Sequence, residues 1–223
     1  MARQENRLGE FAMRRRALLG FVAAAIGVGL APRAVAQRPA VRVMREDPVV
    51  TRTDFDPRRP PPDMPPLAPP ESGVCKTTFE LSAGVTYSAE RLKSGTARIY
   101  VDGLEIVTKL RIDIFTVQNA PPKLRAHEEG HRAIAEHYFE RSATIAEDIG
   151  RRLLGTSYDG RGADDEAAQR DAFGKVIAEI ERAYMARVRV PSAAANERFD
   201  EITRHGLEPI DESEAVARAI AAP

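Results

Sequence analysis

The segment His127-Glu128-Glu129-Gly130-His131 lies within a run from Lys123 to Leu154 that contains no proline. Two prolines come directly before the run, and proline suits the entrance of a helix, where a missing N–H costs nothing. Gly155 follows the run and suits a helix C-cap, because glycine readily takes the left-handed conformation found there. We therefore expect a long helix over this run, with the quoted segment in its first half.

The chain before this helix has the alternation of β-structure. Apolar residues at 97, 99 and 101, and then at 104, 106, 110, 112 and 114, alternate with mostly polar ones. Asp102-Gly103 separates the two runs and is a strong signal for a tight two-residue turn. We therefore expect an antiparallel hairpin that turns at Asp102-Gly103, with a further strand over Thr77–Leu81.

Helical patterns continue after the first helix. One begins near Asp164, another covers Ser192–Arg204 and ends at His205-Gly206, and a short one follows Asp211. Strands first and helices afterwards predict an α+β fold whose N-terminal part is an antiparallel β-hairpin or small sheet. We expect the globular domain over residues 73–223.

The quoted segment has the spacing of a catalytic zinc motif. His127 and His131 are four residues apart, so on a helix both imidazoles project to the same side and can reach one ion. Glu128 projects roughly 100° further round the helix, where it can act as general base for a zinc-activated water. We therefore expect Zn²⁺ as cofactor, His127 and His131 as metal ligands, Glu128 as the catalytic residue, and a zincin-like helical region with a long HExxH helix.

A catalytic zinc site needs a third protein ligand, and the sequence offers several. His205 precedes a glycine at a predicted helix end, where a turn can direct its side chain back to the motif. His137 has the ligand spacing of H-E-x-x-H-x-x-G-x-x-H enzymes, but Ile134 replaces the glycine, so a continuous helix would carry His137 away. Glu197 belongs to an Asn-Glu pair like that of thermolysin-like enzymes, and Gly155–Asp159 resembles the Asp-ligand loop of deuterolysin-like enzymes.

Two N-terminal segments are expected to lie outside the globular domain. Arg14-Arg15-Arg16, the apolar run Ala17–Ala31 and the small-residue site Ala34-Val35-Ala36 predict a twin-arginine-like signal peptide over residues 1–36. The apolar run has 15 residues. Roughly 20 are needed to span a bilayer, so we expect cleavage and no stable membrane span. Residues 37–72 are rich in proline and predict a disordered linker.

Charge and cysteine content limit the possible partners. The chain has 33 basic and 33 acidic residues, and loss of residues 1–36 leaves a net charge of −4, so no basic field favours nucleic acid. Cys75 is the only cysteine, which excludes an internal disulfide, and we expect a buried, inert thiol. The predicted signal peptide indicates a periplasmic or secreted protein.

Two local patterns together resemble a bacterial family of predicted secreted zinc-dependent proteases. One is the HExxH segment, and the other is Phe199-Asp200-x-x-Thr203-x-His205-Gly206, which is similar to that family's Tyr-Asp-x-x-Thr-x-His-Gly block. The resemblance spans roughly Thr86 to Gly206. It implies His205 as the preferred third zinc ligand, with Asp200 and Thr203 as supporting residues that orient a ligand imidazole. The chain departs from the family in having Phe199 for Tyr and no Trp.

The sequence therefore predicts an exported zinc-dependent metallopeptidase that hydrolyses peptide bonds in a protein or peptide substrate. Two alternatives are a non-catalytic exported zinc-binding module and an envelope interaction protein that uses the proline-rich arm. The sequence indicates neither the specific substrate nor the oligomeric state.

Overall fold

The structure is a computed structural model that describes residues 40–67 and 71–222. The signal peptide expected over residues 1–36 lies outside the described residues, and so does the beginning of the predicted linker. None of the helices in the described part is both long and apolar enough to cross a membrane.

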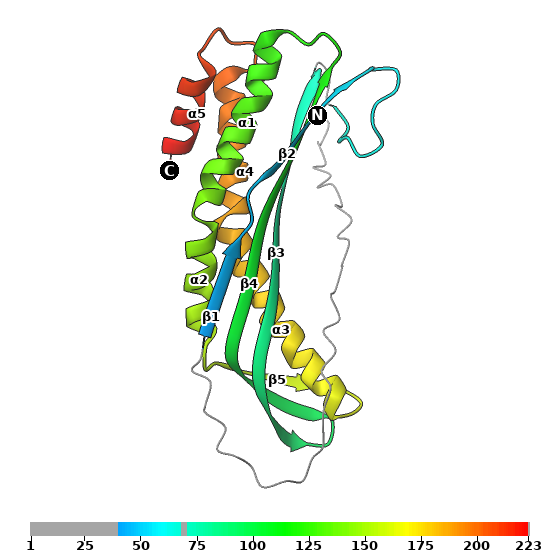
Figure 1. Ribbon diagram of the computed structural model, residues 1–223, viewed down its shortest axis with the longest axis vertical. Coiled ribbons are helices and arrows are strands. Elements are labelled where there is room, and N and C mark those ends of the chain that lie inside the picture. Colours follow the sequence, from blue (N-terminus) through cyan, green and yellow to red (C-terminus); the bar gives the residue numbers. More distant parts are fainter. Residues whose placement is uncertain (1–39, 68–70, 223) are drawn as a thin grey trace, which may run out of the picture. The chain divides into compact units, whose positions relative to one another are not determined.

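One long strand, β4 (Thr96–Val117), pairs with the other four strands of a five-stranded sheet (Figure 1). β3 (Gly73–Lys93) runs antiparallel to β4 and pairs with one edge of β4 along almost the whole length of that strand. The other edge is shared by β1 (Ala40–Arg45) and β2 (Val49–Phe55), both parallel to β4, and by the antiparallel β5 (Ser157–Arg161). The predicted mixture of sheet and helices is confirmed, and the sheet is larger and less uniformly antiparallel than the sequence suggested.

Asp102-Gly103 lies in the middle of β4, so the hairpin turn predicted there is wrong. The register with β3 shifts by one residue at this point, which makes Asp102 the extra residue of a β-bulge. The bulge keeps the apolar side chains on one face, since the buried residues Val101 and Leu104 are three positions apart instead of two. The chain reverses earlier, between β3 and β4, where Gly95 takes a φ of +68°.

Residues 40–55, expected to belong to a disordered linker, form β1 and β2 instead. Neither strand contains proline, and Val41, Val43 and Val50 pack against the main core. The proline-rich composition of the whole segment comes mainly from residues after β2 and conceals the two short strands.

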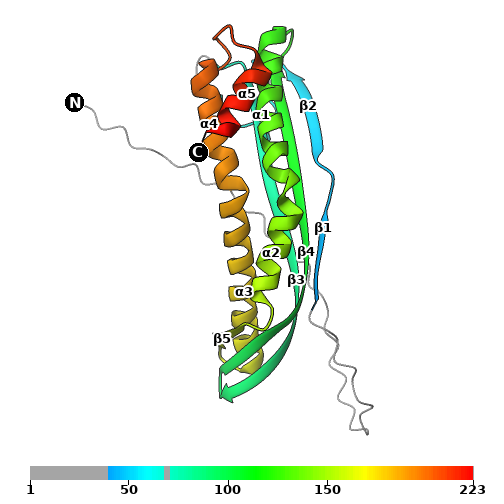
Figure 2. The same cartoon turned by 90° about the vertical axis from the view of Figure 1, so that its left-hand side faces the viewer.

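The helices of the described chain cover one face of the sheet (Figure 2). They are α1 (Pro122–Glu140), α2 (Ser142–Leu153), α3 (Asp165–Arg187), α4 (Arg189–Thr203) and α5 (Glu212–Ala221). The single helix predicted over 123–154 is therefore divided, because the backbone at Arg141 turns to a ψ of 2°. α5 packs against both α1 and α4.

The main core lies between the sheet and α1, α2 and α3. A second, smaller cluster joins α1, α4 and α5 through Ile134, Ala195, Phe199, Ala215 and Ala219, all fully buried. This second cluster holds α4 and α5 against α1 next to the HExxH segment, and so it determines which side chains surround the two histidines.

Candidate metal centre

The two histidines of the HExxH segment point to the same place. His127 and His131 lie one helical turn apart on α1, and their Nε2 atoms are 3.2 Å from each other. The two rings are almost perpendicular, at 82°, with centroids 4.8 Å apart. This is the convergence that the spacing predicted.

Asp200 of α4 supplies a third donor at the same point. Its Oδ1 lies 3.2 Å from Nε2 of His127 and 3.1 Å from Nε2 of His131. The ligand atoms of these three residues all lie within 4.8 Å of one another, a group able to hold a metal ion. Burial raises the pKa of Asp200, but hydrogen bonds with the two imidazoles lower it more, so the carboxyl pKa lies below its usual range.

Asn196 fixes the orientation of the His131 ring. Its Nδ2 donates to the backbone oxygen of Ser192 at 2.8 Å, which turns its Oδ1 toward Nδ1 of His131 at 2.7 Å. Nδ1 must then be the donor, and the neutral ring presents an unshared electron pair at Nε2. Two imidazole nitrogens and a carboxylate oxygen thus face each other, and a metal cation between them would take the place of the protons that they share. The donor set fits a zinc ion.

Phe199 packs directly beneath the two imidazoles. Its ring stacks on His127 at 4.9 Å with an interplanar angle of 14° and meets His131 edge-on at 5.0 Å. Gly130, between the histidines on α1, makes this approach possible, because a Cβ there would lie 2.4 Å from Cζ of Phe199. The glycine of the HExxH segment therefore allows α4 to reach the histidines.

Glu128 lies beside the donor group and is 3% exposed. Its carboxylate packs against the first residue of β3, since a Cβ on Gly73 would come within 2.7 Å of Oε1. Burial raises the pKa of Glu128 to about 7; His131 opposes the shift, whereas Asp200 and Glu71 add to it. A carboxylate with this pKa can accept and return a proton near neutral pH.

The two residues predicted with Asp200 from the family block lie close to the histidines. Thr203 is buried, and its Oγ1 is 3.5 Å from Nδ1 of His127 while donating to the backbone oxygen of Phe199 at 2.8 Å. His205, predicted as the third ligand, has a side chain 62% exposed and lies at the rim, with Nδ1 3.8 Å from Oδ1 of Asp200. The geometry thus brings Asp200, rather than His205, into the three-donor group.

The other predicted ligand candidates lie away from the group. α1 continues through Ile134 as expected, and this leaves His137 exposed and in contact with Tyr138. Glu197 is exposed on α4. The segment Gly155–Asp159 leads into β5 and forms part of the sheet, where Asp159 pairs with Arg98.

Two residues of the site were missed by the reasoning from sequence. One is Asn196, which was noticed only as the neighbour of Glu197. The other is Glu212 at the start of α5, whose Oε2 lies 3.8 Å from Nδ1 of His127. The sequence indicated only that a short helix follows Asp211, which gave no reason to direct Glu212 toward α1.

A surface pocket of about 480 Å³ lies beyond the rim of the centre. Phe55, Met64, Leu67, Val117 and several prolines line much of it. Glu71 is part of its wall, and Oε1 of this residue lies 3.8 Å from Nδ1 of His205. The pocket therefore reaches the rim of the centre at His205, and neither Glu128 nor a residue of the donor group is among those that line it.

Comparison of the chain with protein-family models, with curated proteins and with solved structures finds no match.

Proposed function

We propose that this chain is an exported zinc-dependent metallopeptidase that hydrolyses peptide bonds in a protein or peptide substrate. One observation carries the proposal: the ligand atoms of His127, His131 and Asp200 converge within 4.8 Å, and the buried carboxylate of Glu128 lies next to them. Three protein donors with an adjacent general base are the components of a hydrolytic zinc site.

Zinc would be held by Nε2 of His127, Nε2 of His131 and a carboxylate oxygen of Asp200. When bound, the ion supplies a water of lowered pKa and polarises the substrate carbonyl. Asn196 holds the His131 ring in the tautomer that a metal ligand requires. Phe199 closes one side of the group, so that substrate would have to approach from another side.

Glu128 accepts a proton from the attacking water and returns it to the leaving nitrogen of the cleaved bond. Its burial against Gly73 keeps the carboxylate out of bulk water, which favours proton exchange with the reacting groups over solvent. This role also fits the family of predicted secreted zinc-dependent proteases that the two sequence blocks resemble. The signal-like residues 1–36 support a periplasmic or secreted location.

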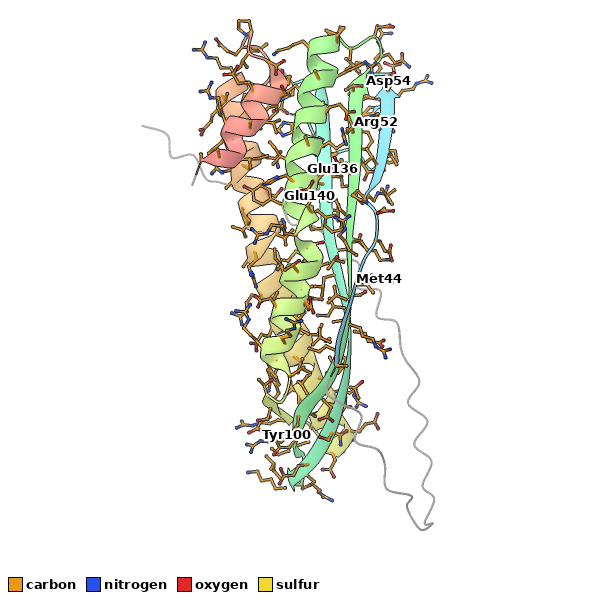
Figure 3. The ribbon with its side chains drawn as sticks, turned by 60° about the vertical axis from the view of Figure 1, so that its left-hand side comes forward. Met44, Arg52, Asp54, Tyr100, Glu136 and Glu140 are labelled. Carbon is orange, nitrogen blue, oxygen red and sulfur yellow. The ribbon has the colours of Figure 1, made fainter. Side chains whose placement is uncertain are left out.

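The proposal is tested with Glu128→Gln and, as a matched control, Glu129→Gln. Glu129 points to another side of α1, where it pairs with Arg132 and with Arg52 of β2, which is labelled in Figure 3. Elemental analysis should find one zinc per chain in the wild type and in both variants. Hydrolysis of a fluorogenic peptide library should fall at least about 100-fold in Glu128→Gln, as expected for loss of a general base. The control should keep its activity.

The same experiment separates the alternatives. Stoichiometric zinc without hydrolysis of any library member, even in the wild type, supports a non-catalytic zinc-binding module. Absence of stoichiometric zinc supports an interaction protein. Hydrolysis that is unchanged in Glu128→Gln would reject this residue as the base.

A further inference from the structure

The first residue of α5 places a buried carboxylate behind one of the two histidines. Oε1 of Glu212 lies 2.6 Å from Nζ of Lys123, and its Oε2 lies 3.8 Å from Nδ1 of His127. Both carboxylate oxygens are shielded from solvent. His127 is therefore flanked by two acids, with Asp200 at Nε2 and Glu212 on the side of Nδ1.

A carboxylate in this position needs partners, because burying an unpaired charge is costly. Lys123 balances the charge at Oε1, and the same ammonium donates to the backbone oxygen of Ile210 at 2.7 Å. Oε2 is left facing the imidazole. Histidines that bind metals usually donate their second ring N–H to a carboxylate or carbonyl, which fixes both the tautomer and the ring orientation.

We propose that Glu212 is a positioning residue for His127. Its Oε2 accepts a hydrogen bond from Nδ1–H, which leaves Nε2 free as a metal ligand and increases its basicity. The two atoms are 3.8 Å apart, and a shift of about 1 Å would bring them to hydrogen-bond length. This inference rests on the proposed function, because it assigns Glu212 to the support of the same centre.

Thr203 is the competing partner of Nδ1. Its hydroxyl oxygen lies 3.5 Å from that atom, but the hydroxyl proton is given to Phe199 and the oxygen also accepts from the backbone N–H of Gly206 at 3.3 Å. Thr203 thus offers a shared, neutral oxygen, whereas Glu212 offers a charged one. Hydrogen bonds to charged acceptors are the stronger.

The assignment makes α5 part of the metal centre. The helix carries no predicted ligand, yet Ala215 and Ala219 are fully buried against α1 and α4 and hold its first turn close to His127. Lys123 ties the loop before α5 to α1. The C-terminal helix therefore determines the orientation of a ligand that lies far away in the sequence.

The test compares Glu212→Gln with Glu214→Gln in the full chain. Glu214 lies in the same first turn of α5 and is exposed, so it controls for the loss of a charge at this helix end. In Glu212→Gln the new amide oxygen stays with Lys123, so its NH₂ group faces Nδ1 and favours the tautomer that carries the proton on Nε2. Zinc affinity, measured by competition with a chelator, should fall roughly 10- to 100-fold in Glu212→Gln. It should change less than about twofold in Glu214→Gln, while Glu212→Asp should recover part of the loss.

Zinc affinity and the protonation of the His127 ring decide the inference. Unchanged zinc affinity in Glu212→Gln overturns it, and a loss seen only in Thr203→Val assigns the role to Thr203 instead. Far-ultraviolet circular dichroism of the metal-free variants verifies that each is folded. If the wild type binds no zinc, the proposed function fails, and ¹H–¹⁵N spectra of the His127 ring still test the contact. A proton on Nδ1 in the wild type that is lost in Glu212→Gln supports it, and a wild-type ring without a proton on Nδ1 overturns it.

Discussion

The ring of Phe199 lies directly against Gly130, so that a Cβ on residue 130 would come within 2.4 Å of Cζ and 2.9 Å of Cε1. The HExxH segment thus has two roles, one in the proposed chemistry and one in helix packing. Its histidines and glutamate carry the proposed chemistry, and its glycine sets the distance between α1 and α4. Asp200 follows Phe199 in the chain, so the position of this ring also sets the position of the third donor.

Gly130→Ala should therefore weaken zinc binding although it changes no donor. The added methyl group must displace a rigid aromatic ring, and overpacking of this kind costs about 1–3 kcal/mol of unfolding free energy. Displacement of Phe199 also moves Asp200 away from the histidines. We expect a drop in zinc affinity of roughly 10- to 100-fold, comparable to loss of a supporting contact, measured by chelator competition.

Gly174→Ala is the matched control. This glycine lies within α3, and no atom would lie within 4 Å of its added Cβ. Alanine is a better helix former than glycine by roughly 0.8–1 kcal/mol, so the control should be slightly more stable than the wild type in urea. Equal stabilisation by Gly130→Ala and Gly174→Ala would show that the Phe199 ring does not pack against Gly130.

Asp200→Asn and His205→Asn separate the two candidates for the third donor. Asp200 contacts both imidazoles. The exposed His205 ring comes no closer than 3.8 Å to Oδ1 of Asp200. We expect Asp200→Asn to lower zinc affinity by more than about 100-fold, since supporting partners alone are worth roughly 10- to 100-fold. Asparagine suits position 205 because it tolerates the left-handed backbone found there, with a φ of 54°.

His205→Asn should change zinc affinity less than about threefold, well below the effect of a lost supporting contact. The reverse order of effects would make His205 the third ligand, as the family resemblance implies. Isothermal titration of the metal-free proteins with zinc measures both variants under the same conditions.

The sequence predicted those parts of the site that depend on local geometry. A spacing of four residues on a helix is enough to bring His127 and His131 together, and to set Glu128 beside them. The third donor depends on how α4 packs on α1, which is decided by the contact between Phe199 and Gly130. The family block placed Asp200 near the site only as a supporting residue, and no local pattern identified it as the third donor or directed Glu212 of α5 toward His127.

The sheet shows the same limit. Asp102-Gly103 suits a tight turn, but a single extra residue between two apolar runs is equally compatible with a bulge in one continuous strand. The choice depends on β3, which pairs on both sides of the bulge. β1 and β2 are short, and their parallel pairing to β4 is a contact distant in sequence.

Asp113 should make the protein sensitive to acid. It is 3% exposed in β4, where Thr51 of β2 donates to its Oδ1 at 2.6 Å and Arg111 donates to Oδ2 at 2.9 Å. Burial raises the pKa of Asp113, but these two hydrogen bonds lower it more, so the folded-state pKa lies below the unfolded one. The stabilisation is therefore complete above the unfolded pKa, near 4, and is lost as the pH falls below it.

Asp113→Asn should lower the free energy of unfolding by about 1.5–3 kcal/mol at pH 7, the range for hydrogen bonds to a charged group. The difference from the wild type should shrink between about pH 5 and pH 2, because the wild-type carboxyl is then protonated. Urea unfolding at several pH values measures it. A difference that stays constant with pH would show that the charge of Asp113 contributes nothing.

Val41 and Gly150 provide a test of the unexpected strand β1. A Cβ on Gly150 of α2 would lie 2.6 Å from Cγ1 and 3.2 Å from Cγ2 of Val41, both on a side chain with little freedom to move. Gly150→Ala should therefore destabilise the protein by about 1–3 kcal/mol, the cost of overpacking, and this should outweigh the gain in helix propensity.

Val41→Ala removes the methyl groups that obstruct the new Cβ. The double variant Val41→Ala/Gly150→Ala should consequently be more stable than the sum of the single effects predicts, with a coupling of roughly 0.5–3 kcal/mol for residues in contact. Urea unfolding of the four proteins completes the cycle. Independent, additive effects would mean that β1 does not pack on α2. Residues 40–45 would then belong to the disordered linker that the composition of this segment predicts.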